Sequence, residues 1–358
     1  MDPVTLEDLG YRPQMEQFRS SGQPEESEPG RVIAEHRERY VVATARGEMD
    51  AEVTGNLRFT AGSREDFPVV GDWVSLMVFG ESMALIHSIY PRSSLIKRKA
   101  PGKDAEIQPI AANVDHAWIV QAVDRDFSLN RMERYLTLCY SSGVAPVIVL
   151  SKTDLAGEPQ LQEMILRVTG RMEKVPVMAV STRTGQGVDD LKQLIRKGET
   201  YCLLGSSGVG KSTLLNELAG RERMKTLSIS EHTGRGRHTT SHRELIVLEG
   251  GGLLIDNPGM REVGITDEAG ALESTFELIR QLAGGCRYRD CTHTSESGCR
   301  VVAAVEEGAL DGQAYENFLK MERERAHLES TLEEKRMKDK QFGKMMKNYK
   351  NQMKRNRE

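Results

Sequence analysis

A glycine-rich stretch at positions 205–212, GSSGVGKS, carries the clearest chemistry in this chain. It fits G-x-x-x-x-G-K-[ST] and lies between a strand-like run and a helix-like run, the setting of a phosphate-binding loop. Glycines let the backbone turn tightly and aim N–H groups at phosphate oxygens, and the following helix N-terminus adds partial positive charge. We expect Lys211 to reach the β- and γ-phosphates and Ser212 to ligate Mg²⁺. The residues predicted to cradle the nucleotide here are Gly205, Ser206, Ser207, Gly208, Val209, Gly210, Lys211, Ser212 and Thr213.

The stretch SKTD, residues 151–154, is a candidate for reading a base. It follows the apolar run VIVL, and ligands of parallel α/β sheets bind at such strand ends. The Asp154 carboxylate can accept hydrogen bonds from guanine N1–H and the exocyclic amine, and the Lys152 stem can lie across the base plane. The next run ends AVST, where backbone N–H groups near Ser181 and Thr182 can meet guanine O6. A lone K-x-D can arise by chance, but two such loops on successive strand ends predict a guanine site that includes Ser151, Lys152, Thr153 and Asp154.

Two further stretches belong to the phosphate side of this site. DNPG, residues 256–259, ends another hydrophobic run, and we expect Asp256 to bind Mg²⁺ through water and the Gly259 N–H to sense the γ-phosphate. Upstream lies HTGRGRHTTSH, which is rich in glycine and arginine and has no periodicity. It predicts a switch whose Thr240, or Thr239, completes the Mg²⁺ shell when a γ-phosphate is present; the alternative is an ordinary polar loop.

The residue after Gly259 is Met260, at a position where many GTPases carry a glutamine that orients the attacking water. Methionine cannot orient water, so we expect slow intrinsic hydrolysis unless another group takes that role. His238 is our candidate for it; the alternative is a loop histidine that faces phosphate-neutral surroundings or RNA.

A cysteine and histidine cluster near the C-terminus predicts a metal site. Its spacing is Cys-x₄-Cys-x-His-x₅-Cys, and three thiolates with one imidazole form a natural tetrahedral set for one structural Zn²⁺. Four protein ligands close the site, so no catalysis is expected from it; the alternative is a group of unconnected thiols. The predicted ligands are Cys286, Cys291, His293 and Cys299, whereas Cys139 and Cys202 are interpreted as small buried apolar side chains.

The elements that position these residues fall into three regions with different patterns of secondary structure. Between residues 31 and 95, five short alternating runs predict a small β-barrel, for which an OB-fold is the leading choice and an SH3-like barrel the alternative. Strand and helix patterns alternate from 114 onwards, which predicts a mainly parallel sheet with helices on both faces. Residues from about 270 to the end are expected to be helical around the cysteine cluster.

Composition places the chain among multidomain proteins of the cytoplasm. A length of 358 residues predicts two or three domains, no run is long and apolar enough to span a membrane, and the acidic start is unlike a secretion signal. The net charge of −4 conceals a tail, residues 335–358, in which ten Lys or Arg face two acidic residues. This net +8 indicates a polyanionic partner, although a solvated helix end is the alternative.

Together these motifs resemble the circularly permuted GTPases of the ribosome small subunit-dependent GTPase A family. The resemblance rests on the order SKTD, AVST, GSSGVGKS, GRGRHTT and DNPG, followed by the cysteine cluster, and covers nearly the whole chain. It implies an OB-fold, a permuted P-loop GTPase core and a helical zinc-binding domain. It also implies GTP, GDP and Mg²⁺ as ligands, and binding to the 30S subunit and its 16S rRNA late in assembly, with subunit-stimulated hydrolysis of GTP.

The domain boundaries that follow are a tail over 1–30, the barrel over 31–95, the GTPase core over 100–280 and the zinc-binding domain with its basic tail over 281–358. The chain departs from the family at Ser151, where asparagine is usual, and we expect serine to brace the phosphate loop less well; Asn257 replaces the usual threonine or serine. Rival hypotheses are a nucleotide-gated RNA-binding module with incidental hydrolysis and a generic ATPase. Nothing in the sequence demands more than a monomer.

Overall fold

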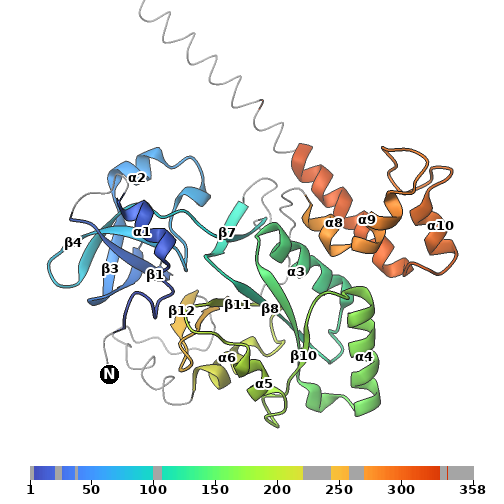
Figure 1. Ribbon diagram of the computed structural model, residues 1–358, viewed down its shortest axis with the longest axis horizontal. Helices are drawn as coiled ribbons and strands as arrows, with labels where there is room; N and C mark the ends of the chain where they lie inside the picture. The colour runs from blue at the N-terminus through green and yellow to red at the C-terminus, as the bar shows by residue number, and fades with distance from the viewer. Residues whose placement is uncertain are drawn as a thin grey trace, which may run out of the picture.

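The computed structural model describes three bodies arranged side by side: a barrel, a central sheet with helices, and a small helical domain (Figure 1). In Figure 1 the chain passes from the blue barrel through the green core to the orange helices at the opposite end. The described residues are 4–20, 26–36, 39–99, 107–220, 243–257, 270–330 and 337.

The barrel closes on five strands. They are β1 (Glu28–His36), β2 (Arg39–Thr44), β3 (Gly47–Val53), β4 (Trp73–Phe79) and β5 (Met83–Ile89). Their order is β1-β2-β3-β5-β4, β4 pairs back with β1, and β3 and β5 run parallel. The strand order is that of an OB-fold, so the closed barrel predicted from the sequence is confirmed. Alternate side chains such as Val32, Val42 and Leu76 fill its interior because successive strand residues face opposite sides.

Two details of the barrel differ from the sequence prediction. One of the five alternating runs, MDAEVTGNLRF over 49–59, is predicted as a single strand, but β3 ends at Val53 and helix α2 (Gly55–Thr60) follows. Thr54 ends the strand because its side chain caps the helix by accepting a hydrogen bond from Leu57 N–H. The barrel also begins at Glu28, three residues before the predicted start. A short 3₁₀ helix (Arg64–Asp66) precedes β4.

Residues 4–20 of the predicted N-terminal tail pack against the rest of the protein. Helix α1 (Pro13–Ser20) follows a turn in which Leu9 is 2% exposed, and Tyr11 packs edge-on against Trp73 with ring centroids 5.0 Å apart. The apolar side chains Leu6, Met15 and Phe18 also contact the main core. These contacts were not apparent from the polar composition because the few apolar residues are spread over many positions.

The connection from barrel to core contains a pair of antiparallel strands. Strands β6 (Leu95–Lys99) and β7 (Ile107–Ala112) pair antiparallel as a separate two-stranded sheet. Ile96 and Ile110 are buried, so this pair of strands belongs to the main core.

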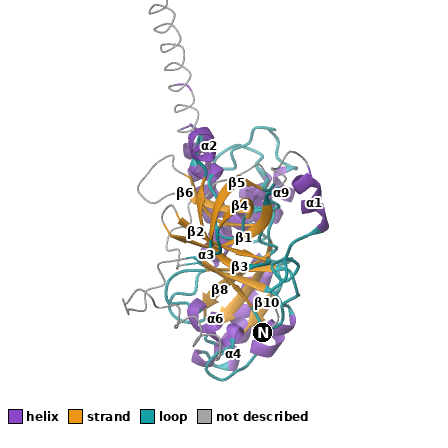
Figure 2. Ribbon diagram, turned by 90° about the vertical axis from the view of Figure 1, so that its left-hand side faces the viewer, coloured by secondary structure: helices purple, strands orange, loops and turns teal. Residues whose placement is uncertain are grey.

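The core sheet confirms the predicted strand and helix alternation. Its parallel strands are ordered β10 (Val177–Ala179), β9 (Ala145–Ser151), β8 (His116–Ala122), β11 (Thr200–Leu204) and β13 (Leu253–Asp256). Strand β12 (Glu244–Val247) pairs antiparallel with β13, as expected for a hairpin, and also meets β1 through Ala34 and Glu244. The core sheet thereby continues into the barrel (Figure 2).

Helices cover both faces of this sheet. Side chains from α3 (Leu129–Ser141) and α4 (Glu158–Arg171) pack with Ile119 and Leu204 on one face. Side chains from α5 (Val188–Gln193) and α6 (Lys211–Ala219) pack with Val120 and Leu203 on the other. Adjacent residues of one strand thus enter different cores, because parallel strands are buried on both faces.

The C-terminal domain is helical, as predicted, and has its own core. It comprises α8 (Ala271–Thr275), α9 (Glu277–Ala283), α10 (Arg300–Glu306) and helical residues 312–330. Leu272, Phe276 and Phe318 pack in one cluster, so this domain begins near residue 271 rather than 281. No helix among the described residues is long and apolar enough to cross a membrane.

Candidate nucleotide and metal sites

The predicted phosphate-binding residues connect β11 to α6. Three glycines in the connection adopt positive φ: Gly205 at 152°, Gly208 at 85° and Gly210 at 95°. A side chain at Gly205 would place its Cβ 2.5 Å from the carbonyl oxygen of Val120, so this position requires glycine. The backbone therefore has the tight form that a phosphate cradle needs, which fits the nucleotide predicted from the sequence.

Lys211 lies at the start of α6, inside the loop. Its Nζ donates to the carbonyl oxygens of Gly205 and Ser206, each at 2.8 Å. Burial lowers the pKa of Lys211, and the nearby Asp256 carboxylate opposes this shift. Ser212 and Thr213 follow in the first turn of α6 with exposed side chains, where the helix N-terminus favours anions. One cation and two hydroxyl groups thus follow the loop within the first turn of α6.

Asp256 ends β13, directly beside the phosphate-loop strand. Burial raises its pKa, while the attraction of Lys211 opposes that shift. The next residue, Asn257, is 1% exposed; its Nδ2 donates to Cys202 Sγ at 2.8 Å, and its Oδ1 has no hydrogen-bond partner. Cys139 and Cys202 are both buried, as expected. An acidic group thus lies at the end of the strand adjacent to Lys211, where Mg²⁺ was predicted.

The base-reading candidates lie at the ends of β9 and β10. Ser151 donates its hydroxyl to the carbonyl oxygen of Val209 at 2.6 Å, in a buried contact that joins this loop directly to the phosphate loop. Serine was expected to support the phosphate loop less well than asparagine, and in the structure it does so through this one direct hydrogen bond. Lys152 adopts a left-handed backbone with φ of 59°, and Thr153 opens the 3₁₀ turn Thr153–Leu155 with its Oγ1 buried and unpartnered.

The Asp154 carboxylate lies within reach of two groups from the β10 loop. Ser181 Oγ donates to it at 2.6 Å, and Arg183 Nη1 lies 3.7 Å away. The backbone N–H of Ser181 donates to the carbonyl oxygen of Gln186 at 2.9 Å. That N–H is therefore engaged, so the donor to guanine O6 expected at this position is better assigned to Thr182, which stays a prediction. Ser181 instead orients Asp154 through its hydroxyl.

Several predicted residues lie outside the part of the chain that the structure describes. These are His238, Thr240, Gly259 and Met260, together with nearly all of the basic tail. Asp124, in contrast, was not predicted; it follows β8 at the same sheet edge, and its carboxylate lies 3.0 Å from Lys152 Nζ. Its place at a parallel strand end was the one signal available.

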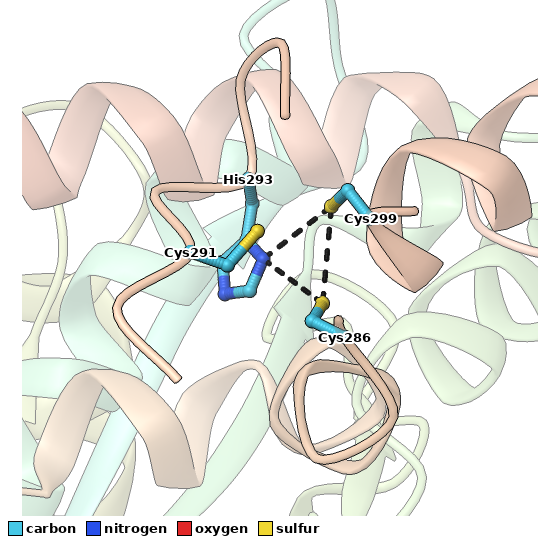
Figure 3. Close-up of side chains that lie close together, drawn as sticks. All are labelled: Cys286, Cys291, His293 and Cys299. Atoms are coloured by element: carbon cyan, nitrogen blue, oxygen red, sulfur yellow. Dashed lines mark hydrogen bonds between the residues drawn. The ribbon is translucent and has the colours of Figure 1, made fainter. Parts of the chain in front are cut away.

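The four predicted zinc ligands converge. Their donor atoms all lie within 4.8 Å of one another, and His293 presents Nδ1 to two thiols (Figure 3). Cys286 Sγ and Cys299 Sγ are each 3.6 Å from that nitrogen and 3.9 Å from each other. A tetrahedral zinc with ordinary bond lengths gives edges of about 3.6 Å for sulfur to nitrogen and about 3.8 Å for sulfur to sulfur, so the three edges among Cys286, His293 and Cys299 fit such a site.

The loop that carries these ligands is held by neighbouring groups. His293 has a left-handed backbone with φ of 59°, and its carbonyl oxygen accepts a 2.6 Å hydrogen bond from the Tyr315 hydroxyl. Glu296 accepts from Thr292 N–H at 2.7 Å. The ligand loop is thus tied to the last described helix, in accord with a structural role.

Family comparisons agree with this architecture. The RsgA GTPase family model matches residues 89–266, which include the predicted base and phosphate loops. An ABC transporter model matches residues 188–356, a range that also contains the phosphate loop.

Relatives that match most of the chain share about two fifths of its residues. "Small ribosomal subunit biogenesis GTPase RsgA 2" of Lactiplantibacillus plantarum is 43% identical over 298 residues, which cover 83% of each chain. "Small ribosomal subunit biogenesis GTPase RsgA" of Opitutus terrae is 40% identical over 338 residues, 90% of each chain.

Solved structures show the same fold. The crystal structure of YjeQ from Thermotoga maritima aligns with a TM-score of 0.61 and 26% identity, covering 84% of this chain and 99% of the other. YloQ, described as a circularly permuted GTPase, aligns with a TM-score of 0.59 and 25% identity, covering 84% and 96%. With the candidate base loop before the phosphate loop and relatives at 40–43% identity over most of its length, the chain belongs to the RsgA GTPase family.

Proposed function

We propose that this chain is a GTPase of small ribosomal subunit biogenesis that hydrolyses GTP to GDP and phosphate and is stimulated by the subunit. The family and the names of its relatives support the GTPase activity and the biogenesis role. We further propose that it acts as a monomer in the cytoplasm and binds the 30S subunit through its 16S rRNA. The observation that carries the nucleotide site is the Ser151–Val209 contact, which joins the base and phosphate loops.

In this proposal each loop has one task. Asp154, oriented by Ser181, accepts hydrogen bonds from the two donors on the guanine edge, N1–H and the exocyclic amine. Adenine does not present this pair of donors. Lys211 leaves its loop carbonyls to contact the phosphates, and its positive charge offsets charge that develops on the transferred group. Ser212 and Asp256 would hold Mg²⁺, which supplies a further positive charge at the β- and γ-phosphates.

The remaining roles rest on the sequence. Thr240 completes the Mg²⁺ shell, the Gly259 N–H senses the γ-phosphate, and His238 takes the place of the glutamine that Met260 replaces. One zinc ion bound by the four-residue cluster shapes the C-terminal domain, and the basic tail adds contacts with rRNA phosphates. Because such contacts release counterions, we expect the affinity for the subunit to fall steeply with salt.

The test is GTP turnover measured with and without purified 30S subunits, together with co-sedimentation in GDP and in a non-hydrolysable GTP analogue. We expect faster turnover with subunits and tighter sedimentation with the analogue. Equal turnover and equal sedimentation in every state would contradict the proposal. Swapping ATP for GTP in a binding assay checks base choice, and Asp154→Asn should loosen GTP selectively.

The second candidate is a nucleotide-gated RNA-binding module whose hydrolysis is incidental. The charged tail motivates it. It predicts that Ser212→Ala, which impairs Mg²⁺ binding, leaves 30S binding and remodelling unchanged. We expect instead that this variant loses the difference between the GDP and analogue states.

A further inference from the structure

Asp124 lies in the loop between β8 and α3, a region to which no nucleotide role was assigned from the sequence. Its Oδ2 is 3.0 Å from Nζ of Lys152, and the two side chains are 24% and 34% exposed. Residues Ala122 and Ser151 are register partners in the parallel β8–β9 pair, so the loops after these strands leave the sheet side by side. The ion pair therefore spans the two loops at the sheet edge where the base is expected.

Lys152 needs positioning because its backbone conformation is unusual and its side chain is long and flexible. A non-glycine residue with φ of 59° and ψ of 37° is disfavoured by about 1 kcal/mol or more, so its surroundings must hold it. Backbone neighbours are fixed: Ser151 Oγ bonds the Val209 carbonyl, and Thr153 N–H bonds the Val180 carbonyl at 3.3 Å. These bonds fix the backbone on either side of Lys152, and Asp124 holds the end of its side chain.

Asp124 is itself held in place before it meets the lysine. Its Oδ1 accepts a hydrogen bond from Asp126 N–H at 3.0 Å, and Gln121 Nε2 donates to the Asp126 carbonyl at 2.9 Å. Burial opposes ionisation of Asp124, but the Asp126 N–H and the Lys152 ammonium together lower its pKa below the usual range. An ionised carboxylate on a fixed turn is a suitable anchor for a long cationic side chain.

We propose that Asp124 is a positioning residue that holds Lys152 across the guanine plane and thereby sets the affinity for guanine nucleotides. With the ammonium held to one side by Asp124, the four-carbon stem lies as a flat apolar surface for the purine ring. The ordering cost of this stem is met before the nucleotide binds. This inference rests on the proposed function of residues 151–154 and adds a residue from another loop.

The experiment measures dissociation constants of GDP and IDP by displacement of a fluorescent guanine nucleotide. IDP lacks the exocyclic amine, so it reports contacts with the ring plane without the amine contact of Asp154. We expect Asp124→Asn to weaken GDP and IDP by the same factor, about three- to ten-fold, as for a partly exposed ion pair with a role in preorganisation. Asp154→Asn should instead weaken GDP more than IDP.

A double-mutant cycle separates positioning from a general structural role. Lys152→Met keeps the stem but removes the ammonium, so Asp124→Asn made in that background should change the GDP affinity less than two-fold. Asp126→Asn is the matched control, because its exposed carboxylate forms no ion pair among the residues that the structure describes, and its main-chain bond to Asp124 is retained. Thermal melts of all variants check that each is folded.

The outcomes distinguish the inference from the proposed function. A wild-type protein that binds no guanine nucleotide would overturn both. Wild-type binding that Asp124→Asn leaves unchanged, or a full loss that persists in the Lys152→Met background, would overturn the role of Asp124 alone. A larger effect on GDP than on IDP would also overturn it, because that pattern belongs to the amine edge.

Discussion

The GTPase core meets its two neighbours in opposite ways. At the barrel junction one buried cation donates to uncharged oxygens, whereas at the zinc-domain junction paired charges face each other. We define the barrel junction as Leu9, Arg31, Gly71, Asn113 and Thr200, and the zinc-domain junction as Glu133, Arg134, Arg171, Asn317 and Glu324.

Arg31 of β1 is the centre of the barrel junction and is 1% exposed. Its guanidinium donates to the carbonyl oxygens of Leu9, Gly71 and Asn113 and to the Thr200 hydroxyl, the last at 2.8 Å. It also lies 5.6 Å from the centre of the Trp73 ring. One side chain therefore joins the N-terminal segment, the barrel and the core sheet.

The zinc-domain junction depends on Glu133 of α3, which is also 1% exposed. Arg171 of α4 donates to both of its carboxylate oxygens, at 2.7 and 2.9 Å, and Asn317 of the C-terminal domain donates at 2.6 Å. Arg134 forms a second, more exposed pair with Glu324 at 2.6 and 2.7 Å. A cavity of about 290 Å³ lies beside this junction, lined by Glu133, Arg171 and Leu310 among others.

The barrel and core therefore form one continuous unit, while the zinc domain is attached through groups that can titrate. Sheet pairing between β1 and β12 supports the first junction, and no strand joins the described part of the C-terminal domain to the core sheet. A buried ionic junction contributes little net stability but is very sensitive to the loss of one partner. Four predictions, given in decreasing order of expected effect, test this contrast.

Metal removal should separate the two junctions most clearly. Chelation of zinc, or Cys286→Ser, should unfold the ligand loop and weaken docking of the C-terminal domain, because structural zinc contributes on the order of 10 kcal/mol to small domains. Hydrogen exchange should rise over 271–330 while the amides of β8 and β11 stay protected and GDP still binds. Simultaneous loss of GDP binding would contradict separate roles.

Arg31→Met should damage the barrel junction. The substitution leaves several buried oxygens without their donor, and we expect the junction to lose about 4 kcal/mol. Hydrogen exchange at β1 and β12 measures the change, and Arg39→Met is the control, since Arg39 is 80% exposed and should change stability by less than about 0.5 kcal/mol. Equal effects of the two substitutions would contradict the central role of Arg31.

The zinc-domain junction should depend on pH through Glu133. Burial raises the pKa of Glu133 from 4.5 to about 7. Arg171 and Asn317 oppose this rise, and the nearby Asp311 carboxylate adds to it. Undocking removes the C-terminal domain from this side of α3, and we expect the Glu133 pKa to return toward 4.5 there. The docked state then binds the proton more tightly, so docking is strongest below about pH 4.5 and weakens as pH rises through 7.

The expected loss between pH 5 and 8 is about 2 kcal/mol, measured by hydrogen exchange in the 312–330 helix with intrinsic rates corrected for pH. Glu133→Gln is neutral at every pH and should remove this dependence. A wild-type profile parallel to that of the Gln variant would show that Glu133 does not titrate in this window.

Arg134→Ala should have the smallest effect. The Arg134 and Glu324 side chains are 18% and 37% exposed, so we expect docking to weaken by only about 0.5–1 kcal/mol, and less at high salt. A double-mutant cycle with Glu324→Ala isolates the pair. A coupling energy that does not change with salt would show that the Arg134–Glu324 pair behaves as a buried ion pair, like that of Glu133 and Arg171.

Motifs whose residues are close in the chain are the ones that residue types reveal. The glycines of 205–210 and the spacing of Cys286, Cys291, His293 and Cys299 are local requirements, of backbone conformation and of metal coordination, so their residue types reveal them. The alternation of strands and helices was likewise apparent from residue patterns. The short helix after β3 was missed although Thr54 gave a local capping signal, because the run around it alternates like a strand.

Contacts between residues that are distant in the chain could not be predicted from the sequence. Ser151 and Val209 are 58 positions apart, Arg31 and Thr200 are 169 apart, and Glu133 and Asn317 are 184 apart. Each partner alone is an ordinary polar residue. The order of the motifs and the chemistry of each loop were therefore readable from residue types, because these depend on neighbours along the chain. Which loop braces which, and which charge is buried against which, arises only when the sheet brings its strand ends together.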